Sequence, residues 1–108
     1  MTPQPGEFWV AEIPFTQGMN SKKRPVLVLW LDGRDAVVAA VTSAAPRSIT
    51  DLTLAAWKSS GLRIASTVRL SRLDCMEQSL LFSRLGHIDA ADADRVRAIW
   101  QQHVQPKF

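Results

Sequence analysis

The chain has 108 residues, of which 46% are hydrophobic and 21% charged, and a formal net charge of +3. This composition excludes an intrinsically disordered protein, and the length predicts one domain, residues 1–108, with one hydrophobic core. The only cysteine, Cys75, excludes an internal disulfide and favours a cytoplasmic protein. The longest uncharged apolar run, residues 25–31, is shorter than the roughly 20 residues of a membrane span. We also expect no signal peptide, because residues 1–5 lack its cationic and apolar regions.

Positive charge is concentrated in the middle of the chain. Residues 18–72 hold nine lysines and arginines against three aspartates, whereas the segments before and after are slightly acidic. A basic face of this kind favours a polyanion such as nucleic acid, whose phosphates lysine and arginine neutralise. A solvated basic surface without such a partner is the alternative. No histidine or cysteine cluster has metal-ligand spacing, so we expect neither a metal nor another cofactor.

The first half of the chain predicts strands. Residues 7–13 are rich in Phe, Trp, Val and Ile, which predicts a strand that Pro14 ends. Residues 15–23 have the polar and small side chains of a flexible loop. Residues 25–31 form a continuous apolar run without helical period, which predicts a strand buried on both faces.

A hairpin joins this strand to the next. Asp32 and Gly33 predict a type I′ turn, which requires positive φ angles that both residues tolerate. Residues 36–43 then return as the partner strand. Pairing about this turn sets residue 24 opposite about residue 41. We therefore expect Arg24 and Thr42 near the same end of the hairpin.

The second half predicts shorter strands and one helix. Residues 52–54, 66–73 and 80–88 have strand patterns, and residues 55–61 predict a single helical turn capped by Gly61. Short strands followed by one terminal helix indicate a small, mostly β barrel with helical decoration.

The terminal helix has its own signals. Asp89 is the expected N-cap, with Asp92 at the third helical position and further negative charge at Asp94. An apolar stripe that ends near Pro106 is formed by Val96, Ile99, Trp100 and His103. All four tryptophans are expected in the core.

Several short motifs together resemble the PemK/MazF toxin family. They are Gly-Glu-Phe-Trp-Val from residue 6, Lys-Lys-Arg-Pro from residue 22 with an apolar run after it, Val-Thr-Ser from residue 41, Trp-x-x-x-Gly-Leu from residue 57, Ser-Thr-Val-Arg from residue 66 and Arg-Leu-Gly from residue 84. The resemblance covers residues 6–104. It implies an SH3-like barrel of the PemK/MazF/CcdB type with a C-terminal helix. It also implies metal-free cleavage of single-stranded RNA that leaves 2′,3′-cyclic phosphate and 5′-hydroxyl ends.

The resemblance also implies residue roles. By motif position, Arg24 matches the family's catalytic arginine and Thr42 its catalytic threonine. A planar guanidinium can meet two nonbridging oxygens of a phosphorane-like transition state, and a hydroxyl can donate to the same phosphate. Arginine is a poor base because its pKa exceeds about 12. We expect the two histidines, His87 and His103, to be packing or surface residues. The predicted RNA-binding residues are Ser21, Lys22, Lys23, Ser43, Arg69 and Arg72.

The resemblance further implies a homodimer that a small cognate antitoxin neutralises by covering the RNA groove. Two alternatives remain open. One is a non-enzymatic toxin of the CcdB kind that inhibits DNA gyrase, although the chain ends in Gln-Pro-Lys-Phe instead of that protein's Trp-Gly-Ile. The other is a non-catalytic RNA-binding module on an SH3-like barrel, in which Arg24 only holds phosphate.

Overall fold

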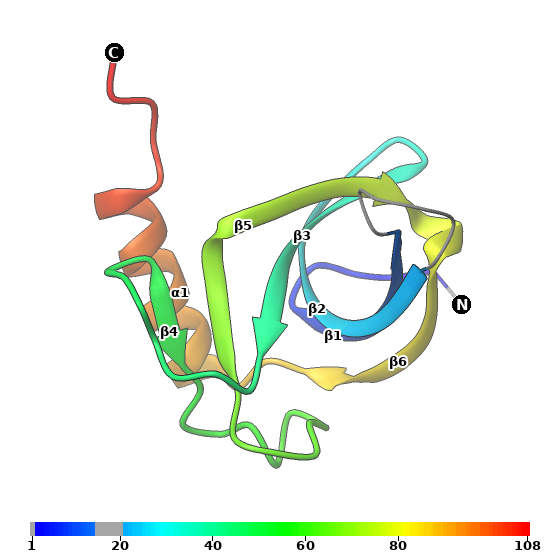
Figure 1. Ribbon diagram of the computed structural model, residues 1–108, viewed down its shortest axis with the longest axis horizontal. Helices are drawn as coiled ribbons and strands as arrows, with labels where there is room; N and C mark the ends of the chain where they lie inside the picture. Colours follow the sequence, from blue (N-terminus) through cyan, green and yellow to red (C-terminus); the bar gives the residue numbers. More distant parts are fainter. Residues whose placement is uncertain (1, 15–20) are drawn as a thin grey trace.

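The computed structural model describes residues 2–14 and 21–108. In this part of the chain, six strands form one antiparallel sheet in the order β4-β5-β3-β2-β1-β6. The elements are β1 (Glu7–Pro14), β2 (Ser21–Asp32), β3 (Asp35–Thr42), β4 (Asp51–Thr53), β5 (Thr67–Glu77), the short 3-10 helix η1 (Gln78–Leu80), β6 (Leu81–His87) and α1 (Ala90–His103). The sheet curls into a barrel without closing, and α1 lies outside it (Figure 1). The mostly β barrel with a C-terminal helix is confirmed.

The sheet buries apolar side chains on both faces. The cluster inside the barrel consists of Trp9, Ala11, Val26, Val28, Ala36, Val38, Met76 and Leu81. A second cluster joins the outer face of the sheet to α1 and to the loop after β4. Its members include Phe8, Leu27, Ala39, Val41, Leu54, Leu62, Val68, Leu70 and Val96. Successive residues of β2 therefore enter different clusters, which explains the uninterrupted apolar run in its sequence.

Two predictions about β2 need correction. The strand begins at Ser21 instead of Pro25, because the ladder with β1 continues through the pairs Glu12–Lys23 and Pro14–Ser21. The predicted loop thus falls partly in β2, and the rest of it lies outside the described residues. Trp30 is 43% exposed instead of buried, and its ring meets Trp100 edge-on with centroids 5.6 Å apart.

The hairpin between β2 and β3 has a different turn from the one predicted. Its central residues are Gly33 and Arg34, between the paired residues Asp32 and Asp35. Gly33 has a φ of +60°, whereas no described residue other than glycine has a positive φ. A type I′ turn needs positive φ at both central residues, so the pattern is that of type II′.

A β-bulge shifts the register of this hairpin. Trp30 pairs with Val37 and Val28 with Val38, which leaves Leu29 without a partner on β3. Beyond the bulge the ladder runs to the pair Val26–Ala40. Continued by two residues, this register sets position 24 opposite position 42, whereas the register before the bulge would set it opposite position 43.

β5 turns a corner that the sequence pattern did not predict. Ala39 pairs with Leu73 and the next residue, Ala40, pairs with Arg69, so residues 70–72 have no partners on β3 (Figure 1). The alternation of residues 66–73 therefore breaks at the corner, where Leu70 is fully buried and Leu73 is 40% exposed. After the corner the strand continues to Glu77 along β3.

Glu7 ties β1 to β6. Its carboxylate accepts from Arg84 Nε at 2.6 Å, from Trp9 Nε1 at 3.0 Å and from the amide of Gln4 at 2.8 Å. Burial raises the pKa of Glu7, but these hydrogen bonds outweigh it and hold the pKa below its usual value.

The segment after β4 forms one helical turn closed by Gly61, as predicted. The amide of Leu62 donates to Trp57 O and that of Gly61 to Lys58 O, with Gly61 at a φ of +92°. These two bonds and the left-handed glycine form a Schellman motif. In the described part of the chain, no helix has the length and apolar character needed to cross a membrane.

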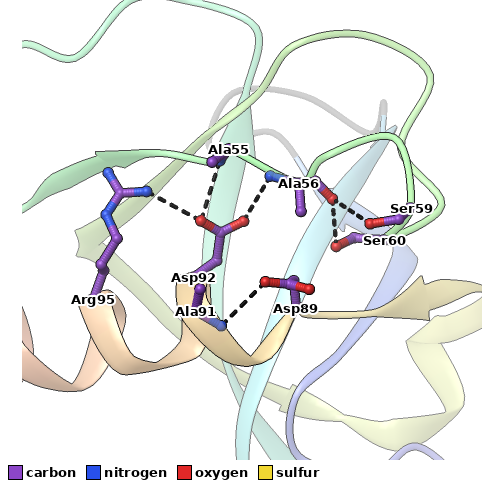
Figure 2. Close-up of polar contacts among 8 residues, drawn as sticks. All are labelled: Ala55, Ala56, Ser59, Ser60, Asp89, Ala91, Asp92 and Arg95. Atoms are coloured by element: carbon purple, nitrogen blue, oxygen red, sulfur yellow. Dashed lines mark hydrogen bonds and ion pairs between the residues drawn. The ribbon is translucent and has the colours of Figure 1, made fainter.

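Asp92 of α1 holds this segment (Figure 2). Its side chain is 1% exposed, and its two carboxylate oxygens accept from the amides of Ala55 at 3.1 Å and Ala56 at 2.9 Å. Arg95 Nη1 donates to the same carboxylate at 3.0 Å. The N-cap role predicted for Asp89 is confirmed, since its side chain accepts from the amide of Ala91. One buried carboxylate thus joins the helix to the loop.

We predict that Asp92→Ala lowers the free energy of unfolding by about 2–3 kcal/mol, because two backbone amides lose the buried carboxylate that accepts from them. The matched control is Asp94→Ala on the same helix. Asp94 also pairs with an arginine three residues on, but its side chain is 78% exposed, so its loss should cost less than about 1 kcal/mol. Urea unfolding of both variants measures the difference, and equal losses would contradict the role of Asp92.

Candidate active site

A groove of about 440 Å³ lies where the ends of β2 and β3 meet the loop before β5. We call it the strand-end groove. Its lining residues are Val10, Lys22, Lys23, Arg24, Pro25, Val41, Thr42, Ser43, Gly61, Leu62, Arg63, Ile64, Ser66 and Leu85. The floor is apolar and sits over the outer core cluster, which includes Val41 and Leu62. The rim is polar and basic.

Four cations and no carboxylate line the strand-end groove. They are Lys22, Lys23, Arg24 and Arg63, and all four are exposed. The four ion pairs found among the described residues involve other arginines, namely Arg69, Arg84, Arg95 and Arg97. Cations around a concave surface attract polyanions and raise their local concentration.

Arg24 and Thr42 lie at the same edge of the groove. The backbone of Arg24 is held from one side by its pairing with Ala11 of β1. On the other side the ladder with β3 ends at the pair Val26–Ala40, and its register, continued by two residues, sets position 24 opposite position 42, within one residue of the simple count. Residues directly opposite in an antiparallel pair project to the same face. The hairpin therefore brings together the two residues that the sequence singles out.

The hydroxyl of Thr42 has a defined orientation. Its Oγ1 accepts a hydrogen bond from the amide of Ala44 at 3.1 Å. A threonine hydroxyl has one proton besides its two lone pairs. With one lone pair committed to Ala44, the proton remains available to a ligand in the groove, so the geometry favours Thr42 as a donor.

Arg63 was missed by the sequence analysis. It follows the Schellman turn, and the loop from Gly61 to Ile64 forms one wall of the groove. This wall is packed backbone to backbone against β6: a Cβ on Gly61 would lie 2.0 Å from Leu85 O, and one on Gly86 would lie 2.1 Å from Ser60 O. The only sequence signal is Gly61 itself, which predicts the turn but not the direction of the next side chain.

The other predicted RNA-binding residues separate into two groups. Lys22, Lys23 and Ser43 line the groove. The backbone of Ser21 pairs with Pro14 at the start of β2, and its side chain lies outside the described part of the chain.

Arg69 and Arg72 do not line the strand-end groove. Arg69 was expected to turn outward, but its side chain is only 16% exposed and its Nε lies 3.3 Å from Asp51 Oδ1. The reason is β4, which pairs with β5 here and brings Asp51 opposite Arg69. Arg72 is exposed at the corner of β5.

Neither histidine lines the groove. The ring of His87 covers Gly6, and its Nδ1 lies 2.8 Å from Ile88 O. His103 is at the end of α1. The arrangement thus offers cation and hydroxyl donors to an anion but no imidazole base. A second hollow, of about 420 Å³, lies between β2 and α1 and is lined largely by apolar side chains, including Trp30 and Trp100.

Comparisons with known proteins identify the family and the fold. The family model of the PemK-like, MazF-like toxin of type II toxin–antitoxin systems matches residues 4–104. A mycobacterial endoribonuclease superposes with a TM-score of 0.75 at 12% identity, over 100% of this chain and 96% of that one. A chain of MazE–MazF from Deinococcus radiodurans gives 0.76 at 18% identity, over 98% and 99%. A mycobacterial endoribonuclease bound to its cognate antitoxin gives 0.69 at 16%, over 96% and 97%. No protein of curated function matches the sequence.

We predict that Gly61→Ala destabilises the fold more than Gly33→Ala. Both glycines have a positive φ, which costs alanine about 1–2 kcal/mol. A Cβ on Gly33 meets nothing within 4 Å, whereas one on Gly61 meets the Leu85 carbonyl. The clash should add at least about 1 kcal/mol. Urea unfolding measures both, and equal values would show that the groove wall is not held by this contact.

Proposed function

We propose that this chain, a member of the PemK-like, MazF-like toxin family of type II toxin–antitoxin systems, cuts single-stranded RNA in the strand-end groove. The observation that carries the proposal is the placement of Arg24 and Thr42 at one edge of a groove with four cations and no carboxylate. The endoribonuclease relatives of the same fold support it.

The proposed reaction is an internal transfer at phosphorus. The ribose 2′-hydroxyl loses its proton and attacks the adjacent phosphorus, and the bond from phosphorus to the 5′ oxygen breaks. The leaving oxygen takes up a proton, which gives a 2′,3′-cyclic phosphate and a 5′-hydroxyl end. Negative charge builds on the two nonbridging oxygens in between, so groups that bind those oxygens more tightly in the transition state accelerate the reaction.

Arg24 and Thr42 have the chemistry to do this. The guanidinium of Arg24 presents paired N–H donors in a fixed plane, which suits two phosphate oxygens. The Thr42 hydroxyl, fixed through Ala44, donates to the same group. A single preorganised donor aimed at developing charge is worth about 3–4 kcal/mol. In this scheme neither residue has to act as a base, and the cations at positions 22, 23 and 63 hold the flanking phosphates.

We further propose that the active form is a cytoplasmic homodimer and that a cognate antitoxin blocks the groove. The relative solved with its antitoxin supports this proposal. An acidic, partly disordered segment would compete with RNA for the same cations.

We predict that Arg24→Ala lowers the cleavage rate of single-stranded RNA by about 10²–10³-fold in EDTA, because a transition-state donor is lost. Wild-type products should carry 5′-hydroxyl ends, which end-labelling by polynucleotide kinase detects without phosphatase. Arg34→Ala is the matched control, since Arg34 is an exposed arginine in the turn of the same hairpin.

Three results would contradict the ribonuclease proposal. RNA left intact across many sequences would exclude the reaction, and RNA bound tightly but uncut would favour a binding module. Gyrase-dependent DNA breaks would favour the CcdB-like alternative. If the Arg24→Ala and Arg34→Ala variants cut RNA equally fast, the ribonuclease proposal stands but Arg24 has no role in its mechanism.

We predict that Arg63→Ala weakens RNA binding more than Arg72→Ala, because only Arg63 lines the groove. One lost phosphate contact should reduce the slope of log K against log salt concentration by about 0.7 for a single strand. Titration of a labelled RNA at several salt concentrations measures both variants. If Arg72→Ala weakens RNA binding more than Arg63→Ala, the RNA binds along the corner of β5 instead of in the groove.

A further inference from the structure

Phe82 is an exposed aromatic residue beside the strand-end groove. It lies in β6, and 48% of it is accessible to solvent. Its neighbour Leu81 pairs with Ala11 and enters the core inside the barrel, while Ser83 pairs with Val10. Phe82 itself has no partner on β1, so it is the extra residue of a β-bulge. Bulges redirect side chains and are common next to functional sites.

A lysine of the groove covers the ring of Phe82. Lys23 Nζ lies 4.9 Å from the ring centroid, which is a cation–π contact. Lys23 also lines the strand-end groove. The aromatic ring and the basic groove therefore share a side chain and form one continuous surface.

The same strand connects Phe82 to the groove along its length. A second bulge in β6 leaves Leu85 without a partner, between the pairs Phe8–Gly86 and Trp9–Arg84. Leu85 lines the groove. Phe82 is three residues away, which is roughly 10 Å along a strand. A short single strand that leaves the groove can reach the ring.

We propose that Phe82 and Lys23 form a subsite for one unpaired base of the RNA strand. The inference rests on the proposed function, because it requires RNA in the groove. An exposed ring with a flexible cation over it matches the chemistry of a nucleotide, since the base stacks on the ring while the ammonium moves to the adjacent phosphate. The acidic antitoxin segment proposed above would also bring a partner for Lys23, so the test below includes the antitoxin as the other occupant.

The subsite has a defined energetic signature. Stacking of a base on an aromatic side chain is tolerant of sequence, and removal of the ring weakens binding on the order of 10-fold or more. Loss of Lys23 removes a phosphate contact instead, so it should weaken binding of oligonucleotides with bases and without bases alike. The two residues therefore respond differently to an oligonucleotide without bases.

The test uses the full chain and equilibrium binding. The first probe is a labelled random-sequence oligonucleotide with every 2′-hydroxyl methylated, so that it cannot be cut by 2′-hydroxyl attack. The second is a tetrahydrofuran oligonucleotide of equal length, which has the phosphates but no bases. Fluorescence anisotropy gives Kd for the variants Phe82→Leu, Phe82→Trp and Lys23→Ala. Leu73→Ala is the control, because Leu73 is similarly exposed but lies outside the groove.

Phe82→Leu should raise Kd about 10-fold for the first probe and leave it unchanged for the second. Phe82→Trp should bind both probes at least as well as wild type, and Lys23→Ala should weaken both. Unchanged Kd for Phe82→Leu on the first probe, or an equal loss on both, would overturn the subsite. So would a Phe82→Leu variant that keeps its RNA affinity and loses affinity for the cognate antitoxin. If the Kd values follow the expected pattern but the protein cuts no RNA, the ribonuclease proposal is overturned and the subsite proposal stands.

Discussion

The candidate site depends on the register between β2 and β3. A hairpin fixes which residues face one another, and a shift of one position turns a side chain to the other face of the sheet. Here the register set by the turn would place position 24 opposite position 43, and the register after the bulge at Leu29, continued two residues past the last pair, places it opposite Thr42. The alternate burial of β2 in two core clusters holds this register, because a slip would exchange the inner and outer side chains. Apolar packing in the interior thus determines where Arg24 and Thr42 lie at the surface.

The strand-end groove has one side formed by paired strands and one side formed by a loop. Arg24 and Thr42 are attached to paired strands, whereas Arg63 follows a turn whose position depends on Asp92 and on the close contact between Gly61 and β6. Catalytic donors gain from fixed geometry, because little reorganisation is then needed as charge develops. Phosphate-binding cations need less precision, since their long side chains adapt to the strand. This division suits the proposed ribonuclease site, in which one phosphate reacts and its neighbours are held.

Much of this structure could be predicted from the sequence, and the exceptions have physical causes. The strands, the hairpin and the Gly61 turn follow from apolar patterns and turn residues. The bulge at Leu29 could not be predicted, because Leu29 is one apolar residue in a continuous apolar run and nothing in the run marks it as unpaired. The corner of β5 was not predicted, because residues 66–73 were assigned to one continuous strand. Arg69 was predicted to bind RNA, because no local sequence pattern indicates that Asp51 of β4 pairs opposite it. Arg63 was missed because the direction of its side chain depends on contacts between segments far apart in the sequence.

The bond from Asp92 to the loop after β4 also constrains the order in which the molecule can be assembled. The two amides that it holds belong to residues 55 and 56, more than 30 positions earlier in the chain. Until α1 docks, these two amides have no acceptor from Asp92 and can exchange their protons with water. The wall that carries Arg63 is completed only when the helix is in place. Local opening of α1 alone would therefore loosen one side of the groove while the paired strands of the barrel stay formed.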